Sequence, residues 1–222
     1  MNVNWRIEWL SLALIAGMFI ASAVAWPNAP DSIPVHWGIT GEPDRYGGKF
    51  EGLLLTPIMA IGLYLMLLFL PRIDPKRTNY QRFAGIYRLI RIMMVVFMAG
   101  IHGVVLAAVF GYDIDIGMTI MIMAGLLLAV LGNYFGKMKP TWFVGIRTPW
   151  TLTSDRSWDR THRLGGRLFV ILGLLLAGAG VIGQEWAFYT VFGLLFVMII
   201  FLVVYSYLIW EADPDRRNGL GG

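Results

Sequence analysis

Six long apolar stretches alternate with polar segments along the chain, and none of the six contains Asp, Glu, Lys or Arg. They cover residues 9–26, 53–70, 92–110, 116–135, 168–183 and 187–210. A helix of about 20 apolar residues crosses the hydrocarbon core of a bilayer, so each stretch predicts a membrane span. The fifth stretch is short, and we expect its helix to begin earlier, with Arg163 and Arg167 extending their charges to the lipid headgroups. The pattern predicts an all-α integral membrane protein, built as a six-transmembrane-helix bundle.

Basic residues are concentrated in one set of connections. If the N-terminus is cytoplasmic, sixteen of the eighteen Lys and Arg residues fall in inside segments, and only Arg45 and Lys49 fall outside. This asymmetry predicts that both termini are cytoplasmic. A composition of 57% hydrophobic and 14% charged residues excludes most soluble classes, so we expect the lipid bilayer as a partner and no direct nucleic-acid binding. We expect a single membrane domain over 1–222, with an N-terminal hairpin at 9–70 and a four-helix part at 92–210.

The predicted outside loop, residues 27–52, has Pro and Gly placed as in a chain of defined turns. Its candidate binding residues are His36, Trp37, Glu42, Asp44, Arg45 and Tyr46. The aromatic and acidic side chains suit an external ligand; the alternative is an ordered loop that packs at the outer interface. A metal site is not favoured, because the loop has one histidine and no familiar ligand spacing. We therefore expect no metal and no cofactor.

The second inside loop, residues 136–167, is the most distinctive polar segment. Ser154 is placed as the N-cap of a helix, because its hydroxyl can accept a hydrogen bond from a backbone N–H in the first turn. Trp158, His162 and Gly165 then recur at the spacing of one helix face. This spacing predicts an amphipathic interfacial helix that lies on the inner leaflet and leads into the fifth span.

Few polar side chains fall within the predicted spans, and His102 and Asn133 are the intramembrane polar residues of interest. A histidine at membrane depth is a functional candidate. The structural alternative is a neutral imidazole bonded to a hydroxyl, to Asn133 or to a backbone carbonyl, and it is favoured because no span contains an acidic partner. Arg88 and Arg91 are interpreted as basic anchors at the inner surface.

Catalytic chemistry is not favoured, although Ser, Thr, Asp and His all occur in the second inside loop. Ser154 is better explained as a helix cap, and no strand-turn-helix elbow is available to expose a nucleophile. We therefore predict no catalytic residue and a protein that is not an enzyme. A membrane enzyme acting at the inner leaflet and a small transporter or flippase-like protein remain alternatives.

Two segments resemble known families. The inner segment closely resembles the SdpI family of bacterial membrane proteins, through Gly132-Asn133-Tyr134, Lys137-Met138-Lys139-Pro140, the run from Gly145 to Leu152, Trp158, and the run from Thr161 to Gly166. The outer segment, from Ile33 to Gly47, resembles a small domain of unknown function that often forms the N-terminal part of these proteins.

The resemblance implies a toxin-immunity protein of the bacterial cell membrane. Such proteins protect a producer cell from a secreted toxin peptide, and in the family's namesake system the membrane protein captures a cytoplasmic helix-turn-helix repressor. On this basis the outside loop residues named above are expected to recognise the toxin. The residues expected to recognise a partner inside are Arg147, Thr148, Trp150, Trp158, His162 and Arg163.

Overall fold

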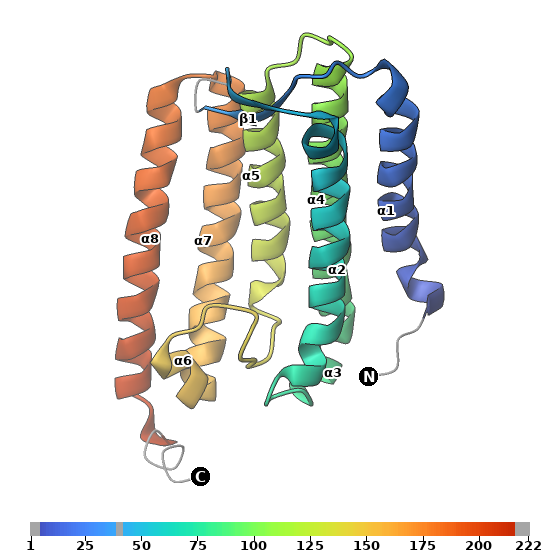
Figure 1. Cartoon of the computed structure of the whole chain (residues 1–222). Helices are drawn as coiled ribbons and strands as arrows, with labels where there is room; N and C mark the ends of the chain where they lie inside the picture. Colours follow the sequence, from blue (N-terminus) through green and yellow to red (C-terminus); the bar gives the residue numbers. More distant parts are fainter. Residues whose placement is uncertain (1–4, 39–41, 216–222) are drawn as a thin grey trace.

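Six long helices run side by side through the computed structural model, which describes residues 5–38 and 42–215 (Figure 1). The helices are α1 (Trp5–Ala25), α2 (Leu55–Ile73), α4 (Ala84–Val109), α5 (Ile116–Phe135), α7 (Asp155–Ile182) and α8 (Glu185–Glu211). Each is long and apolar enough to cross a membrane. The predicted six-span helical bundle is confirmed, and α5 has the same bounds as the fourth apolar stretch.

Short elements gather at the two ends of the bundle. One end carries the turn Trp26–Asn28, the antiparallel strands β1 (Ile33–Trp37) and β2 (Pro43–Gly47), and the π-helical turn Phe50–Leu54; we call it the hairpin end (Figure 1). The other end carries α3 (Asn79–Arg82) and α6 (Pro149–Thr153), and is called the loop end. Helix α1 begins and helix α8 finishes at the loop end (Figure 1).

The β-hairpin is a feature that the sequence pattern did not predict. Each strand contains a proline, and the pairing register shifts between Pro34 and His36 and again between His36 and Trp37. Such irregularities remove the alternation of apolar and polar residues by which a strand is recognised. Ile33 of β1 and Leu53 are fully buried against α1 and α4 at the hairpin end of these helices, so the hairpin is packed firmly on the bundle.

The helices pack as two groups, one formed by α1, α2 and α4 and the other by α5, α7 and α8. Ile15, Met18, Tyr64 and Val95 are among the buried residues of the first group, and Leu172 and Leu202 are among those of the second. Helices α4 and α5 contact each other and join the two groups.

Glycine residues bring α5 and α7 unusually close. A Cβ atom added to Gly125 would lie 2.4 Å from the carbonyl oxygen of Gly173, and one added to Gly132 would lie 2.8 Å from the carbonyl oxygen of Gly166. The neighbours are backbone atoms, which cannot move aside as a flexible side chain can. Glycine on both helices therefore allows direct backbone packing, the usual role of small residues between membrane helices.

The amphipathic stretch before the fifth span differs from the prediction in one respect. It is helical from Asp155, as expected, but it continues into the span without a break as a single helix, α7. Trp158, His162 and Gly165 are buried against other parts of the protein. The prediction that this face lies on the inner leaflet is therefore corrected. The loop at residues 137–148 covers the face instead, and the loop backbone supplies hydrogen-bond partners for His162 and Trp158.

Candidate functional site

The loop at 137–148 is held to α7 by two aromatic side chains. The imidazole Nε2 of His162 accepts a hydrogen bond from the backbone N–H of Ile146 at 2.9 Å, while Nδ1 donates to the carbonyl oxygen of Trp158, also at 2.9 Å. These two partners require the neutral imidazole with its proton on Nδ1. The indole of Trp158 stacks on His162 and donates to the carbonyl of Met138 at 3.0 Å. Gly145 has φ +118°, and a Cβ there would lie 2.4 Å from His162 Nε2, so this turn requires glycine.

Hydroxyl groups attach the next part of the loop to α8. Thr148 caps α6 through a reciprocal pair of hydrogen bonds with Thr151, and its Oγ1 also lies 2.9 Å from the hydroxyl of Ser206 on α8. Ser154 is the N-cap of α7, as the sequence predicted, and its hydroxyl also donates to the carboxylate of Asp213 beyond α8. Every one of these five polar residues is buried. They therefore stabilise the loop end rather than present chemistry to the outside.

Asp74, at the end of α2, joins the two helix groups at the loop end. Its carboxylate is 2% exposed, and accepts hydrogen bonds from the backbone N–H of Lys76 at 2.7 Å, the hydroxyl of Tyr80 at 2.8 Å and the backbone N–H of Trp142 at 3.0 Å. Burial, followed by the hydrogen bond to this carboxylate, raises the pKa of Tyr80. Tyr80 therefore remains a neutral donor, and Asp74 holds the loop at 137–148 against the α1–α2–α4 group.

The six predicted inside residues divide into two sets. Thr148, Trp158 and His162 are buried parts of the network just described. Arg147 and Arg163 are exposed, and Arg147 donates to the carbonyl oxygen of Trp142 at 2.7 Å. Trp150 is half-buried, with its ring packed edge-on against Tyr207 at 5.2 Å. Only Arg147, Trp150 and Arg163 are therefore placed to meet a partner without opening the loop.

The six predicted outside residues lie on or beside the hairpin. His36 on β1 and Asp44 on β2 form a cross-strand pair, with Nδ1 and Oδ1 2.6 Å apart. Arg45 pairs with Glu51 of the π-helical turn at 2.6 Å, which ties β2 to the start of α2. Glu42 and Tyr46 are exposed and Trp37 is half-buried. Within the described residues, no group of three His, Cys, Asp or Glu side chains could hold a metal ion.

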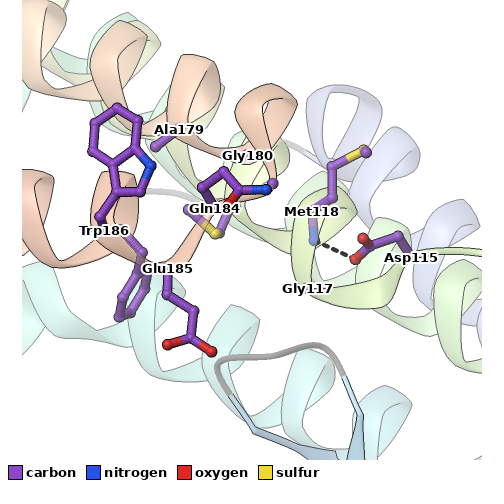
Figure 2. Close-up of a pocket in the computed structure, with 11 residues that line it drawn as sticks. Asp115, Gly117, Met118, Ala179, Gly180, Gln184, Glu185 and Trp186 are labelled. Atoms are coloured by element: carbon purple, nitrogen blue, oxygen red, sulfur yellow. Dashed lines mark hydrogen bonds between the residues drawn. The ribbon is translucent and has the colours of Figure 1, made fainter.

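A cavity of about 410 Å³ opens at the hairpin end between the N-terminus of α5, the C-terminus of α7 and the N-terminus of α8 (Figure 2). Its wall includes the carboxylates of Asp115 and Glu185 and the exposed indole of Trp186. Asp115 also caps α5 by accepting from the backbone N–H of Met118 at 2.8 Å. The connections that contribute to this wall, residues 111–115 and 184–186, are short, and no sequence motif marks either of them.

His102 has the structural arrangement that the sequence favoured. Its Nε2 lies 3.2 Å from the hydroxyl of Ser22, which in turn lies 2.6 Å from the carbonyl oxygen of Leu53. Asn133 is exposed on α5 and is not a partner of His102. The two predicted intramembrane polar residues are therefore not brought together.

Arg91 is not the surface anchor that the sequence suggested. It is 3% exposed, and its guanidinium forms an ion pair with Glu8, which is 4% exposed and also accepts from the hydroxyl of Tyr64 at 3.2 Å. Among the residues that the structure describes, the Nε and Nη1 atoms of Arg91 have no hydrogen-bond partner. The sequence contains one indication of this pair. Glu8 directly precedes the first apolar stretch and Arg91 directly precedes the third, so both residues lie at the same end of their helices.

Apolar side chains separate the two buried polar groups of the α1–α2–α4 bundle. Ile15 and Met18 of α1 and Val95 of α4 lie between the Glu8–Arg91 pair and His102, and all three are buried. A path for ions or polar solutes needs continuous polar lining. This layer interrupts any such lining between the two groups.

Six apolar helices with ordered polar elements at both ends define a multi-pass integral membrane protein. Residues 137–206 match the SdpI/YfhL protein family, and residues 13–61 match DUF1648, a domain of unknown function. The resemblance to the SdpI family that the sequence motifs indicated is therefore confirmed over residues 137–206, and a DUF1648 match precedes it in the chain.

Two individual relatives are similar to the chain. The chain is 20% identical to "Immunity protein SdpI" of Bacillus subtilis (strain 168) over 210 residues, which cover 95% of this chain and 97% of that protein. It is also 32% identical to an uncharacterized protein of Archaeoglobus fulgidus over 59 residues, which cover 27% of this chain and 32% of that protein. No solved structure matches the chain significantly.

Proposed function

We propose that this protein is an immunity protein that protects the membrane from a secreted toxin peptide. The observation that carries the proposal is the similarity to the immunity protein of Bacillus subtilis over nearly the full length of both chains. A non-enzymatic role is consistent with the same similarity. The apolar layer between Glu8 and His102 disfavours the transporter alternative.

In this proposal the hairpin end faces outside and binds the toxin. The supporting observations are the positive-inside distribution of Lys and Arg and the polar residues displayed on the hairpin, above all the exposed His36–Asp44 pair. The acidic cavity formed with Asp115 and Glu185 lies at the same end and adds surface suited to a basic peptide. Reporter fusions at each terminus test the orientation, and a reporter active only outside would contradict it.

The loop end then faces the cytoplasm and is the proposed surface for a helix-turn-helix repressor. We expect Arg147 and Trp150 to contact it, and this expectation is supported by their exposure. Thr148, Trp158 and His162, in contrast, are buried and hold the loop from within. The sequence predicted that these three residues contact the partner directly. In this proposal they are buried and support the loop that carries Arg147 and Trp150.

The test is expression of the chain in a toxin-sensitive Bacillus subtilis strain that lacks its own immunity protein. We expect the unmodified chain to protect, Asp44→Ala to reduce protection, and Asp113→Ala, an exposed carboxylate at the same end, to leave it unchanged. Arg147→Ala should retain protection but lose co-purification of the repressor with membranes, whereas Arg156→Ala, a second exposed arginine, should keep both. A chain that is present in the membrane and gives no protection would refute immunity toward that toxin.

A further inference from the structure

Two adjacent clefts at the loop end are walled by basic side chains that the proposed function does not use. The first, about 350 Å³, lies between α5 and α7 and is lined by Lys137, Arg163 and Arg167. The second, about 290 Å³, shares Arg163 and Arg167 and adds Arg160, with Tyr205 of α8 on its far side. Arg163 and Arg167 therefore stand between the two clefts and face both.

Glycine residues shape the floor of the first cleft. Gly132 of α5, Gly136 directly after α5 and Gly166 of α7 line it at the point where the two helices are in backbone contact. A Cβ on Gly136 would lie 3.3 Å from the Cα of Arg163. The three glycines add no side chains to this floor, and Asn133 and Val170 complete the lining between the basic groups.

The basic groups around the clefts lack ion-pair partners in the part of the chain that the structure describes. Over residues 5–38 and 42–215, none of Lys137, Arg160, Arg163 and Arg167 forms an ion pair; Lys137 lies over the ring of Tyr134 at 5.2 Å. Asp159 is one turn from Arg163 on α7 without pairing to it. Several positive charges held together without a counter-charge repel one another, and they favour an anion in the space between them.

An apolar surface begins directly beside the clefts. Ile171 and Leu174 follow Arg163 and Arg167 along the same face of α7, at helical spacing, and are 55% and 57% exposed. A ligand that occupies the clefts and extends along this face must therefore have an anionic part joined to an apolar part. Basic pockets between helices at the inner membrane surface are suited to the headgroups of anionic lipids.

We propose that the clefts around Arg163 and Arg167 bind the headgroup phosphate of an anionic phospholipid, whose acyl chains lie along α7. The sequence predicts that both arginines extend their charges to the lipid headgroups and that Arg163 also contacts a protein partner. The proposal goes further, because it assigns one anionic headgroup to a defined site between the two clefts. The proposal requires only that the loop end lies at a lipid–water interface, so it does not depend on toxin immunity.

The test uses the purified full-length protein in mild detergent, with native mass spectrometry to count retained lipid. Dioleoyl phosphatidylglycerol is the probe, and dioleoyl phosphatidylcholine is the comparison with the same acyl chains and no net charge. We expect preferential retention of phosphatidylglycerol, and about 30-fold weaker binding in Arg163→Gln/Arg167→Gln, which corresponds to about 1 kcal/mol per basic residue. The matched control is Arg77→Gln/Arg82→Gln, which removes two exposed charges at the same end and should leave binding within about threefold.

Several results would overturn the proposal. Equal weakening in the two double variants would mean diffuse attraction without a site, and equal retention of phosphatidylcholine would mean that the phosphate charge is not recognised. Displacement of lipid by millimolar inorganic phosphate would identify a free-phosphate site, and preferential binding of a soluble polyglutamate peptide would identify a protein-docking surface. Arg163→Lys/Arg167→Lys, which keeps both charges, must retain binding, and its failure with an unchanged melting temperature would also count against the proposal.

Discussion

The buried ion pair between Glu8 and Arg91 gives the sharpest test of how the bundle is stabilised. Glu8→Gln keeps the size of the side chain and removes its charge, and leaves the guanidinium of Arg91 buried without a counter-ion. Arg91→Met removes the positive charge and leaves the carboxylate of Glu8 buried without a counter-ion. The double variant Glu8→Met/Arg91→Met replaces both charges by apolar chains of similar length.

The expected magnitude follows from the burial of both groups. With 4% and 3% of their surfaces exposed, neither Glu8 nor Arg91 can recover hydration when its partner is lost. Breaking a buried pair by removing one partner costs about 3–5 kcal/mol, and an unpaired arginine within a membrane helix costs about 2.5–3.5 kcal/mol. We therefore expect each single variant to lower the free energy of unfolding by about 3 kcal/mol. The double variant should lie within about 1 kcal/mol of the unmodified protein, because it buries no charge.

The assay is reversible unfolding of the purified protein in detergent micelles by added dodecyl sulfate, followed by far-UV circular dichroism. All four proteins of the cycle are measured, so that the coupling between the two sites is obtained directly. Additive effects, with the double variant about as unstable as the two single losses combined, would refute the buried pair. Single variants that change the unfolding free energy by less than about 0.5 kcal/mol would also refute the buried pair, because an exposed ion pair contributes about that much to stability.

Three further changes test the packing and the loop. Gly132→Leu should destabilise the protein by at least about 1–3 kcal/mol, because its side chain would meet the backbone of α7, whereas Gly103→Leu on an open face of α4 should have little effect in the same assay. Asp74→Asn should speed hydrogen exchange at the backbone N–H of Trp142, which loses a charged acceptor; unchanged exchange would contradict this contact. His162→Phe should lower the unfolding free energy by about 1–3 kcal/mol by leaving a loop N–H unpaired, and an equal loss in His162→Gln, which keeps an acceptor, would argue against that cause.

The sequence was sufficient for the features that depend on local pattern. The bounds of α5 follow from the length of one apolar stretch, and Ser154 was recognised as a cap from its position before a helical repeat. The β-hairpin was missed for the same reason, because its prolines and two register shifts leave no local pattern to read.

Features that depend on a partner far along the chain could not be predicted. Arg91 looks like an interfacial anchor until Glu8, 83 residues earlier, is known to face it. His162 and Thr148 carried the chemistry expected of a binding surface. Their hydrogen bonds instead go to the backbone N–H of Ile146 and to the hydroxyl of Ser206, which only the packing of α7, α8 and the loop brings within reach.

The contacts of α2 offer a physical route between the two ends of the bundle. The π-helical turn Phe50–Leu54, which leads directly into α2, packs against the hairpin: its Leu53 packs with Ile33 and its Glu51 pairs with Arg45. The last turn of α2 is followed by Asp74, whose carboxylate holds the loop at 137–148. A helix of 19 residues is about 28 Å long and moves as a rigid body, so displacement of the hairpin must be carried to that loop or absorbed by a break in α2. If toxin binding outside alters partner binding inside, Asp74→Asn should therefore weaken the second effect while leaving the first, and an unchanged coupling would mean that another element transmits it.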